Sequence, residues 1–318
     1  MPGWSEVLGE IKQEEINNKA SLQANPAALV INPTDKVRKK YLSELSAHTG
    51  RNVFLYASCW LQKSQIPGDL ITVHPSDMDG FLESVKGVDT DLGLDLILHS
   101  PGGSPEAAEQ IVNYLRQKFD SIRVIVPMMA MSAATMMACA ADSIVLARHS
   151  TLGPTDPQLT IRTNTGELRM VPAYALKAEF EKAEIAGTDG DGKYAAWAPL
   201  IGQYSPGLLT LCNSSQELTA ELVGKWLAAY MFKGDAAAAE IAGRLAAYFG
   251  QPEHHTHGRP LMRDQLKDEG LVVEDLEDDD KFQDLVMSVY HAATHTLGGT
   301  NVVKIIENSM GRSYMRAV

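Results

Sequence analysis

The pattern of hydrophobic and polar positions differs between the first 46 residues and the rest of the chain. Over residues 1–46, apolar residues recur at helical spacing among charges, which predicts helical segments. From residue 52 the rhythm changes to short apolar runs separated by helical segments of about ten residues. The runs are NVFLYASCW, LGLDLILHS, SIRVIVPMM and DSIVLARHS. Strands that alternate with helices predict a parallel sheet covered on both faces, so the centre of the protein is of the α/β class.

The later half of the chain is predicted to be richer in helix. Residues 159–171 are typical of a hairpin around Asn164, Thr165 and Gly166, and a helix is expected over residues 172–187. Residues 188–193 are typical of a loop, and residues 205–249 are alanine-heavy and helical in pattern. A last helix over residues 281–297 and a strand over residues 301–310 complete the prediction.

Composition and charge exclude several classes of protein. Hydrophobic residues make up 45% and charged residues 21% of 318 positions, which is typical of a globular chain and excludes collagen-like, disordered and disulfide-scaffold classes. Lys and Arg number 28 against 40 Asp and Glu, so the net charge is −12. Because this charge repels phosphates and anionic lipid surfaces, neither nucleic acid nor a membrane is expected as a partner.

Cysteine usage and the first residues favour a cytoplasmic location. Cys59, Cys139 and Cys212 are odd in number and show no CxxC spacing, so neither a disulfide framework nor a thiolate zinc site is expected. The opening MPGWSEVLGEIKQEEINNKA has no apolar core of a secretory signal. Residues 124–141 have the length of a membrane span, but Pro127 interrupts them, and a buried strand followed by a buried helix is the better interpretation.

Two glycines stand between a predicted strand and a predicted helix in LDLILHSPGGSPEAAEQI. Backbone N–H groups at the start of a helix carry partial positive charge, so the amides of Gly102 and Gly103 suit an anion or a developing oxyanion. A tight turn that needs a positive φ is the plain structural alternative. His99, which ends the strand, is expected to line the same cleft.

Ser132 follows the next strand, at the start of a helix of small residues. A serine at this position is also a common N-cap. However, both junctions are expected at the carboxyl edge of one parallel sheet, where α/β folds place their ligands. The amides of Gly102 or Gly103 and of Ala133 would then converge on a carbonyl oxygen while the Ser132 hydroxyl attacks its carbon.

These motifs resemble a known family. LILHSPGG, AMSAATMMACAADSIVL and LGPTDPQ are similar to the Clp-peptidase/crotonase superfamily, and more narrowly to the serine dehydrogenase proteinase family, which is related to signal peptide peptidase A. The resemblance covers residues 52–157 and resumes at HGRPLMRDQLKDEGLV. It implies a ββα-repeat spiral core over residues 51–275 with a helical insertion at about 172–250, a helical N-terminal arm over 1–50 and a helix and strand extension over 276–318.

The resemblance also implies a catalytic triad. The family order of Ser, Asp and His matches Ser132, Asp156 in GPTDPQ and His257 in HTHGRP. Such an Asp would hold the Nδ1–H of the histidine and leave Nε2 for the serine proton. An ordinary Asx-type turn is the plain alternative for Asp156. For His257 the alternatives are a solvated loop imidazole or a metal-binding tract with His254 and His255.

Other bases stay open at this point. In signal peptide peptidase A the base is a lysine, and Lys177, on the predicted helix over residues 172–187, is the first candidate here, with Lys182 and Lys193 behind it. In Clp-type peptidases the base is a histidine, but the matching position holds Thr155, with His149 close by.

The resulting hypothesis is a soluble serine endopeptidase without a cofactor. Its expected substrate is a peptide or unfolded protein, and the resemblance implies a homo-oligomer, with or without an ATPase or chaperone partner. Two alternatives are a catalytically silent peptide-binding protein of the same fold and a crotonase-like acyl-CoA enzyme, which uses the same pair of amides.

Overall fold

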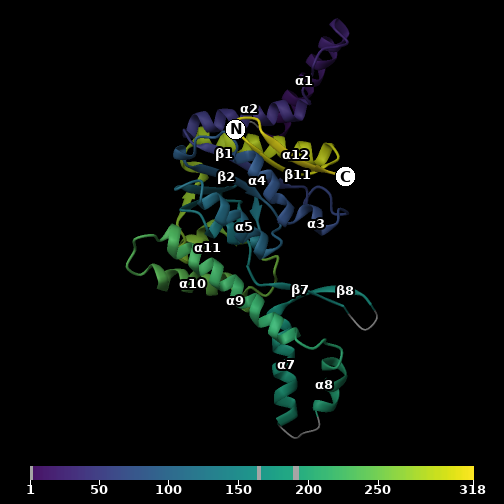
Figure 1. Ribbon diagram of the computed structural model, residues 1–318, viewed down its shortest axis with the longest axis vertical. Helices are drawn as coiled ribbons and strands as arrows, with labels where there is room; N and C mark the ends of the chain where they lie inside the picture. The colour runs from purple at the N-terminus through teal and green to yellow at the C-terminus, as the bar shows by residue number, and fades with distance from the viewer. Residues whose placement is uncertain (1–2, 163–165, 189–192) are drawn as a thin grey trace. The chain divides into compact units, whose positions relative to one another are not determined.

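Two compact units make up the computed structural model, which describes residues 3–162, 166–188 and 193–318. The first unit combines Met1–Leu152 with Pro260–Val318, and the second is Gly153–Arg259. The first unit holds the central sheet, whereas the second is mostly helical (Figure 1). The mixture of a central sheet and many helices confirms the predicted α/β class.

The central sheet of the first unit is mixed. Its strand order is β10-β5-β3-β2-β1-β11-β12. Strands β10 to β1 pair in parallel, as predicted, and β11 adds to β1 in antiparallel fashion. The bounds are β1 (Asn52–Ser58), β2 (Leu94–His99), β3 (Ile122–Val126), β5 (Ser143–Leu146), β10 (Val273–Asp275), β11 (Val302–Asn308) and β12 (Ser313–Ala317).

Both faces of this sheet are covered, which explains the continuous apolar runs of its strands. In β1, Val53, Leu55 and Ala57 belong to the core cluster that also contains residues of the helices on one face. Phe54 and Tyr56 point the other way, where their rings lie 5.8 and 5.6 Å from those of Phe119 and Phe81. Successive side chains of a strand therefore enter two different cores.

Helices from both ends of the chain share one face of the sheet. These are α2 (Pro33–Thr49) and α12 (Asp280–Gly299), and α1 (Trp4–Ala24) packs on these two helices and projects away from the sheet (Figure 1). The other face is covered by α4 (Met78–Val85), α5 (Pro105–Arg116) and α6 (Ala133–Cys139). The shorter elements of the unit are α3 (Gly68–Ile71), η1 (Pro75–Asp77), η2 (Thr90–Leu92), α11 (Arg263–Asp268) and η5 (Leu276–Asp278). A small ladder joins β4 (Met129–Ala130), β6 (Thr151–Leu152) and β9 (Leu261–Met262).

Local sequence explains where α5 begins. The Ser104 hydroxyl accepts a hydrogen bond from the Ala107 N–H at 3.0 Å, and Pro105 occupies the first helical position, where a missing N–H costs nothing. The predicted apolar stripe of this helix is buried against the sheet.

The second unit contains a hairpin and a group of helices. The predicted hairpin is confirmed as β7 (Gln158–Arg162) paired with β8 (Leu168–Pro172), although Asn164 and Thr165 of its turn lie outside the described residues, as do residues 189–192 of the predicted loop. The helices are α7 (Ala173–Thr188), α8 (Tyr194–Ile201), α9 (Leu208–Trp226), η3 (Leu227–Met231), α10 (Ala238–Gly250) and η4 (Pro252–His254). Throughout the described part of the chain, every helix is too short or too polar to cross a lipid bilayer.

A fully buried ion pair ties α2 to the sheet. The Arg38 guanidinium donates to both carboxylate oxygens of Glu307 on β11, at 2.5 and 3.0 Å, and to the Thr296 hydroxyl on α12 at 2.7 Å. Both side chains of the pair are inaccessible to solvent. Three elements that are distant in the sequence therefore meet at one charge.

Arg38→Ala is expected to lower the free energy of unfolding by about 3–5 kcal/mol, because it leaves the Glu307 carboxylate buried without its cation. Urea denaturation measures the change. The matched control is Lys36→Ala on the same helix, where Lys36 is exposed and pairs with the half-buried Glu14, and its cost is expected to stay below about 1 kcal/mol. Equal losses in the two variants would contradict the assignment.

Candidate active site

Direct backbone hydrogen bonds join the two strand-to-helix junctions. The Ser100 N–H donates to the Met129 carbonyl at 3.3 Å, and the Met131 N–H donates to the Ser100 carbonyl at 3.0 Å. These bonds form a parallel bridge between Ser100, which directly follows β2, and Ala130 of β4, which follows β3. The glycine pair and Ser132 therefore lie side by side at the carboxyl edge of the sheet, as predicted.

Gly102 approaches the Ser132 turn more closely than any side chain would allow. A Cβ atom at Gly102 would lie 2.4 Å from the Met131 carbonyl oxygen, 2.6 Å from the Ser132 Cβ and 2.8 Å from the Ala133 nitrogen. Gly102 also has a φ of +91°, which L residues rarely adopt. Both steric space and backbone conformation thus require glycine here.

Ser132 has a strained backbone conformation. Its φ is +53° and its ψ is −121°, and a positive φ in a residue other than glycine occurs mostly at functional turns. Hydrogen bonds on both sides hold the turn, from the Ala134 N–H to the Met131 carbonyl at 2.9 Å and from the Met136 N–H to the Ser132 carbonyl at 3.0 Å. A serine on a sharp strand-to-helix turn presents its hydroxyl at the edge of a sheet.

The Ser132 hydroxyl does not act as an N-cap. It makes no capping hydrogen bond to α6, and the described residues of the first unit offer it no other hydrogen-bond partner. The side chain is only half-buried. The N-cap interpretation is therefore wrong, because this backbone conformation turns the hydroxyl away from the helix N–H groups.

The three candidate oxyanion donors are not equivalent. The Gly102 N–H already donates to the Ser100 hydroxyl at 3.2 Å. At Gly103, a parallel bridge to Val73 uses the neighbouring Gly102 carbonyl and Ser104 N–H, so the Gly103 N–H points away from that bridge. The Ala133 N–H is the first of α6 and has no acceptor within the helix. Gly103 and Ala133 are consequently the two available donors.

Asp156 and His257 meet within the second unit. The Asp156 carboxylate accepts from the His257 Nδ1 at 2.8 Å, and its other oxygen accepts from the Gln158 amide at 2.7 Å. A carboxylate only accepts, so this contact assigns the proton to Nδ1 and the lone pair to Nε2. The pair, predicted across 101 positions of sequence, has the geometry of a base with its orienting acid.

The alternative bases have other partners. The Lys177 ammonium on α7 donates to the Gln216 side chain on α9 at 3.1 Å, within the second unit. His149 in the first unit is exposed, and its Nε2 contacts the Pro127 carbonyl at 3.0 Å. Neither Lys177 nor His149 has a carboxylate partner in these contacts, whereas His257 does.

His99 does not line the cleft, contrary to expectation. Its ring is buried between Trp60 and Tyr290, at centroid distances of 5.8 and 5.2 Å, and its Nδ1 contacts the Met129 carbonyl. Burial lowers the pKa of His99 to about 4, so the ring is neutral at physiological pH. Its place at the strand end directs it into the core because alternate residues of β2 face opposite sides.

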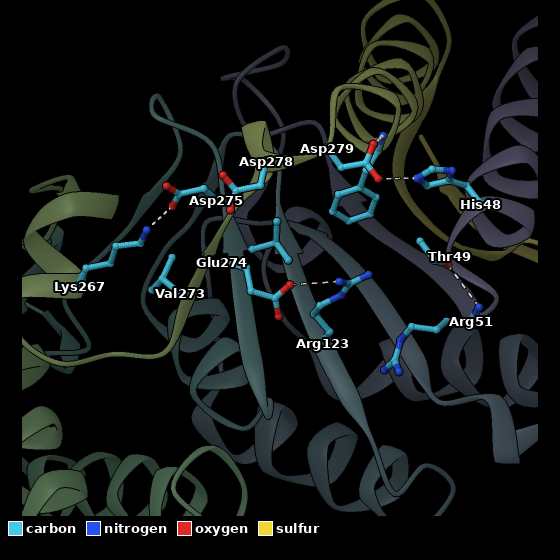
Figure 2. Close-up of a pocket in the computed structure, with 12 residues that line it drawn as sticks. His48, Thr49, Arg51, Arg123, Lys267, Val273, Glu274, Asp275, Asp278 and Asp279 are labelled. Atoms are coloured by element: carbon cyan, nitrogen blue, oxygen red, sulfur yellow. Dashed lines mark hydrogen bonds and ion pairs between the residues drawn. The ribbon is translucent and has the colours of Figure 1, made fainter.

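A pocket of about 600 Å³ elsewhere in the first unit is lined by charges that neutralise one another. Figure 2 shows Arg123 paired with Glu274, His48 with Asp279 and Lys267 with Asp275. None of the predicted site residues lines this pocket.

Several supporting residues escaped sequence reasoning. Ser100 and Val73 hold the glycine pair, and Gln158 holds Asp156. Gln158 lies two residues after Asp156, a spacing that local reasoning can find. The approach of Val73 to Gly103 comes from residues far apart in sequence, and no local pattern indicates it.

Comparisons with known proteins bear on the family of this chain. Residues 66–179 match the family model described as ClpP-like SDH-type serine proteinase, which confirms the predicted resemblance. The matched segment includes both glycines, Ser132 and Asp156, but not His257.

Two proteins of Methanocaldococcus jannaschii are similar to the chain. It is 37% identical over 197 residues to uncharacterized protein MJ1495 and 43% identical over 83 residues to uncharacterized protein MJ0137. These alignments cover 62% and 26% of this chain, and the chain spans 57% and 29% of the lengths of the two relatives.

Gly102→Ala is expected to lower the free energy of unfolding by about 2–4 kcal/mol, because the added methyl overlaps the Ser132 turn. Gly50→Ala is the matched control, since Gly50 also has a positive φ, of +67°, but open space around it. The control is expected to lose only about 1 kcal/mol. Urea denaturation of both variants checks the difference, and similar losses would show that the close approach is not constraining.

Proposed function

We propose that this chain, whose residues 66–179 form a ClpP-like SDH-type serine proteinase domain, is a serine endopeptidase. The observation that carries the proposal is the Ser132 turn, whose hydroxyl makes no capping hydrogen bond and which is in close contact with Gly102 of the glycine pair. A serine hydroxyl needs a base to become a nucleophile at neutral pH, and His257 oriented by Asp156 is the base that we assign.

Chain connectivity supports this assignment. Ser132 follows β4 by two residues, and within the first unit β4 pairs with β6 and β6 with β9. Only three residues separate Leu152 of β6 from Asp156, and three separate His257 from Leu261 of β9. Asp156 and His257 are thus each only a few residues along the chain from a strand of the β4–β6–β9 ladder, and Ser132 closely follows another strand of it.

The proposed reaction proceeds in two steps. His257 Nε2 takes the Ser132 proton as the oxygen forms a bond to the peptide carbonyl carbon, and the Gly103 and Ala133 amides stabilise the negative charge on the carbonyl oxygen. The C–N bond then breaks as His257 returns the proton to the amine. In the second step, water attacks the acyl-enzyme by the same route and releases Ser132.

The substrate class is a peptide or unfolded protein, and assembly into a homo-oligomer stays a prediction. The Ser-Lys dyad with Lys177, the silent binding protein and the acyl-CoA enzyme are outcomes that the experiments below separate.

Ser132→Ala is expected to abolish hydrolysis of fluorescein-labelled casein and covalent labelling by a biotin–fluorophosphonate probe, since both reactions need the activated hydroxyl. Circular dichroism and the urea midpoint, which are expected to change little, control for folding. Ser143→Ala, at another half-buried serine of the first unit, is expected to keep both activities. Hydrolysis that survives Ser132→Ala in preparations free of other proteases would refute the nucleophile. A wild-type chain that is folded but inert to the probe would favour the silent protein.

His257→Asn is expected to lower kcat about 10³–10⁴-fold, as loss of the base does in serine hydrolases. The control is His255→Asn, two residues away and exposed, with kcat expected to stay near the wild-type value. Lys177→Gln is expected to change kcat less than about tenfold. If Lys177→Gln is inert while His257→Asn is active, the dyad replaces the triad.

A further inference from the structure

A buried ion pair in the first unit contacts the segment of residues 72–74, which in turn pairs with the two glycines. Lys304 on β11 and Asp77 in η1 have almost no solvent exposure, and the ammonium donates to both Asp77 oxygens at 2.7 and 2.9 Å. The same ammonium donates to the Thr72 carbonyl at 2.7 Å. The Asp77 carboxylate also accepts from the His74 N–H at 2.9 Å. This pair therefore clamps the backbone on both sides of Val73.

Val73 is the residue that pairs with the glycines. Its N–H donates to the Gly102 carbonyl at 2.7 Å, and its carbonyl accepts from the Ser104 N–H at 2.9 Å. A Cβ atom at Gly103 would lie only 2.4 Å from the Val73 carbonyl oxygen. The backbone of Val73 thus packs against one side of Gly103 and fixes the position of the residues on either side of it.

A chain of hydroxyl groups reaches the other side of the glycine pair from the same carboxylate. The Tyr56 hydroxyl donates to the Asp77 Oδ2 at 2.7 Å, and the Ser100 hydroxyl interacts with Tyr56. Ser100 in turn accepts from the Gly102 N–H. Burial, reinforced by Asp77, raises the pKa of Tyr56 well above its usual value, so the phenol keeps the proton that it donates. The two hydrogen bonds at the ends of this chain are Tyr56 to Asp77 and the Gly102 N–H to Ser100.

We propose that Asp77, Lys304, Tyr56 and Ser100 are positioning residues that hold the Gly103 N–H in place to stabilise an oxyanion. The inference rests on the proposed function and extends it to residues that do not touch substrate. Glycine has the greatest backbone freedom of any residue, whereas an oxyanion donor is effective only when its direction is set before the reaction. Buried, fully hydrogen-bonded polar groups supply that rigidity, at the cost of desolvating two charges.

The test uses Tyr56→Phe and Ser100→Ala in the full-length protein, with Tyr41→Phe as the matched control. Tyr41 is a buried tyrosine of the same unit whose hydroxyl donates to a carboxylate, Glu10, at 2.6 Å. The first measurement is the second-order rate of labelling by the biotin–fluorophosphonate probe. The second is hydrogen–deuterium exchange of the peptide that contains residues 100–104.

Tyr56→Phe is expected to slow labelling about tenfold, and Ser100→Ala at least as much, because both weaken the orientation of the donor without removing it. The double variant is expected to label no more slowly than Ser100→Ala alone, since both changes break one chain of contacts. Exchange over residues 100–104 is expected to accelerate in these variants. Tyr41→Phe is expected to leave both readouts unchanged.

Labelling of Tyr56→Phe and Ser100→Ala at the wild-type rate would overturn the positioning role and leave the proposed endopeptidase intact. If the wild-type chain is not labelled at all, the proposed function fails and the catalytic part of this inference fails with it. The exchange measurement still decides whether the chain of contacts orders the glycine pair. Exchange over residues 100–104 that is unchanged in Tyr56→Phe and Ser100→Ala would show that it does not.

Discussion

The structure depends most on the close approach of one glycine to one serine turn. Two adjacent parallel strands end at the same edge of the sheet, and backbone bonds from Ser100 to Met129 and Met131 carry their pairing past the strand ends. Only a residue without a side chain fits where Gly102 meets Met131, Ser132 and Ala133. The contact between the two turns brings the Ser132 turn and the glycine pair together, as the proposed reaction requires.

The groups that the chemistry needs are divided between two compact units. The sheet-based unit carries the proposed nucleophile and the proposed oxyanion amides, whose positions follow from strand pairing. The second unit carries a histidine whose tautomer is set by a carboxylate, which a glutamine side chain holds in turn. Each of the two groups of residues is ordered by the hydrogen bonds of its own unit.

The C-terminal strand β11 contributes more than an extra strand. It supplies Glu307, which binds Arg38 of α2, and Lys304, whose ion pair with Asp77 supports the glycine loop. Buried charges are costly to desolvate, and their presence on opposite faces of one strand is compatible with stability only because each is paired and hydrogen-bonded. The last residues of the chain are therefore linked both to the packing of the N-terminal helices and to the candidate site.

Sequence alone determined the α/β class, the main strands and helices, the glycine pair, the serine and the Asp156–His257 pair. These follow from apolar periodicity, from glycine and proline positions and from a resemblance to a protease family, all of which are local or motif-based. Tertiary structure alone decided which amides are free, that Ser132 is not a cap and that His99 is buried. It alone also placed Lys304, Asp77 and Tyr56 beneath the glycines. The reason is that hydrogen bonds and steric overlap between distant segments depend on side-chain direction and strand register, and no periodicity in the sequence encodes either across 200 or more positions.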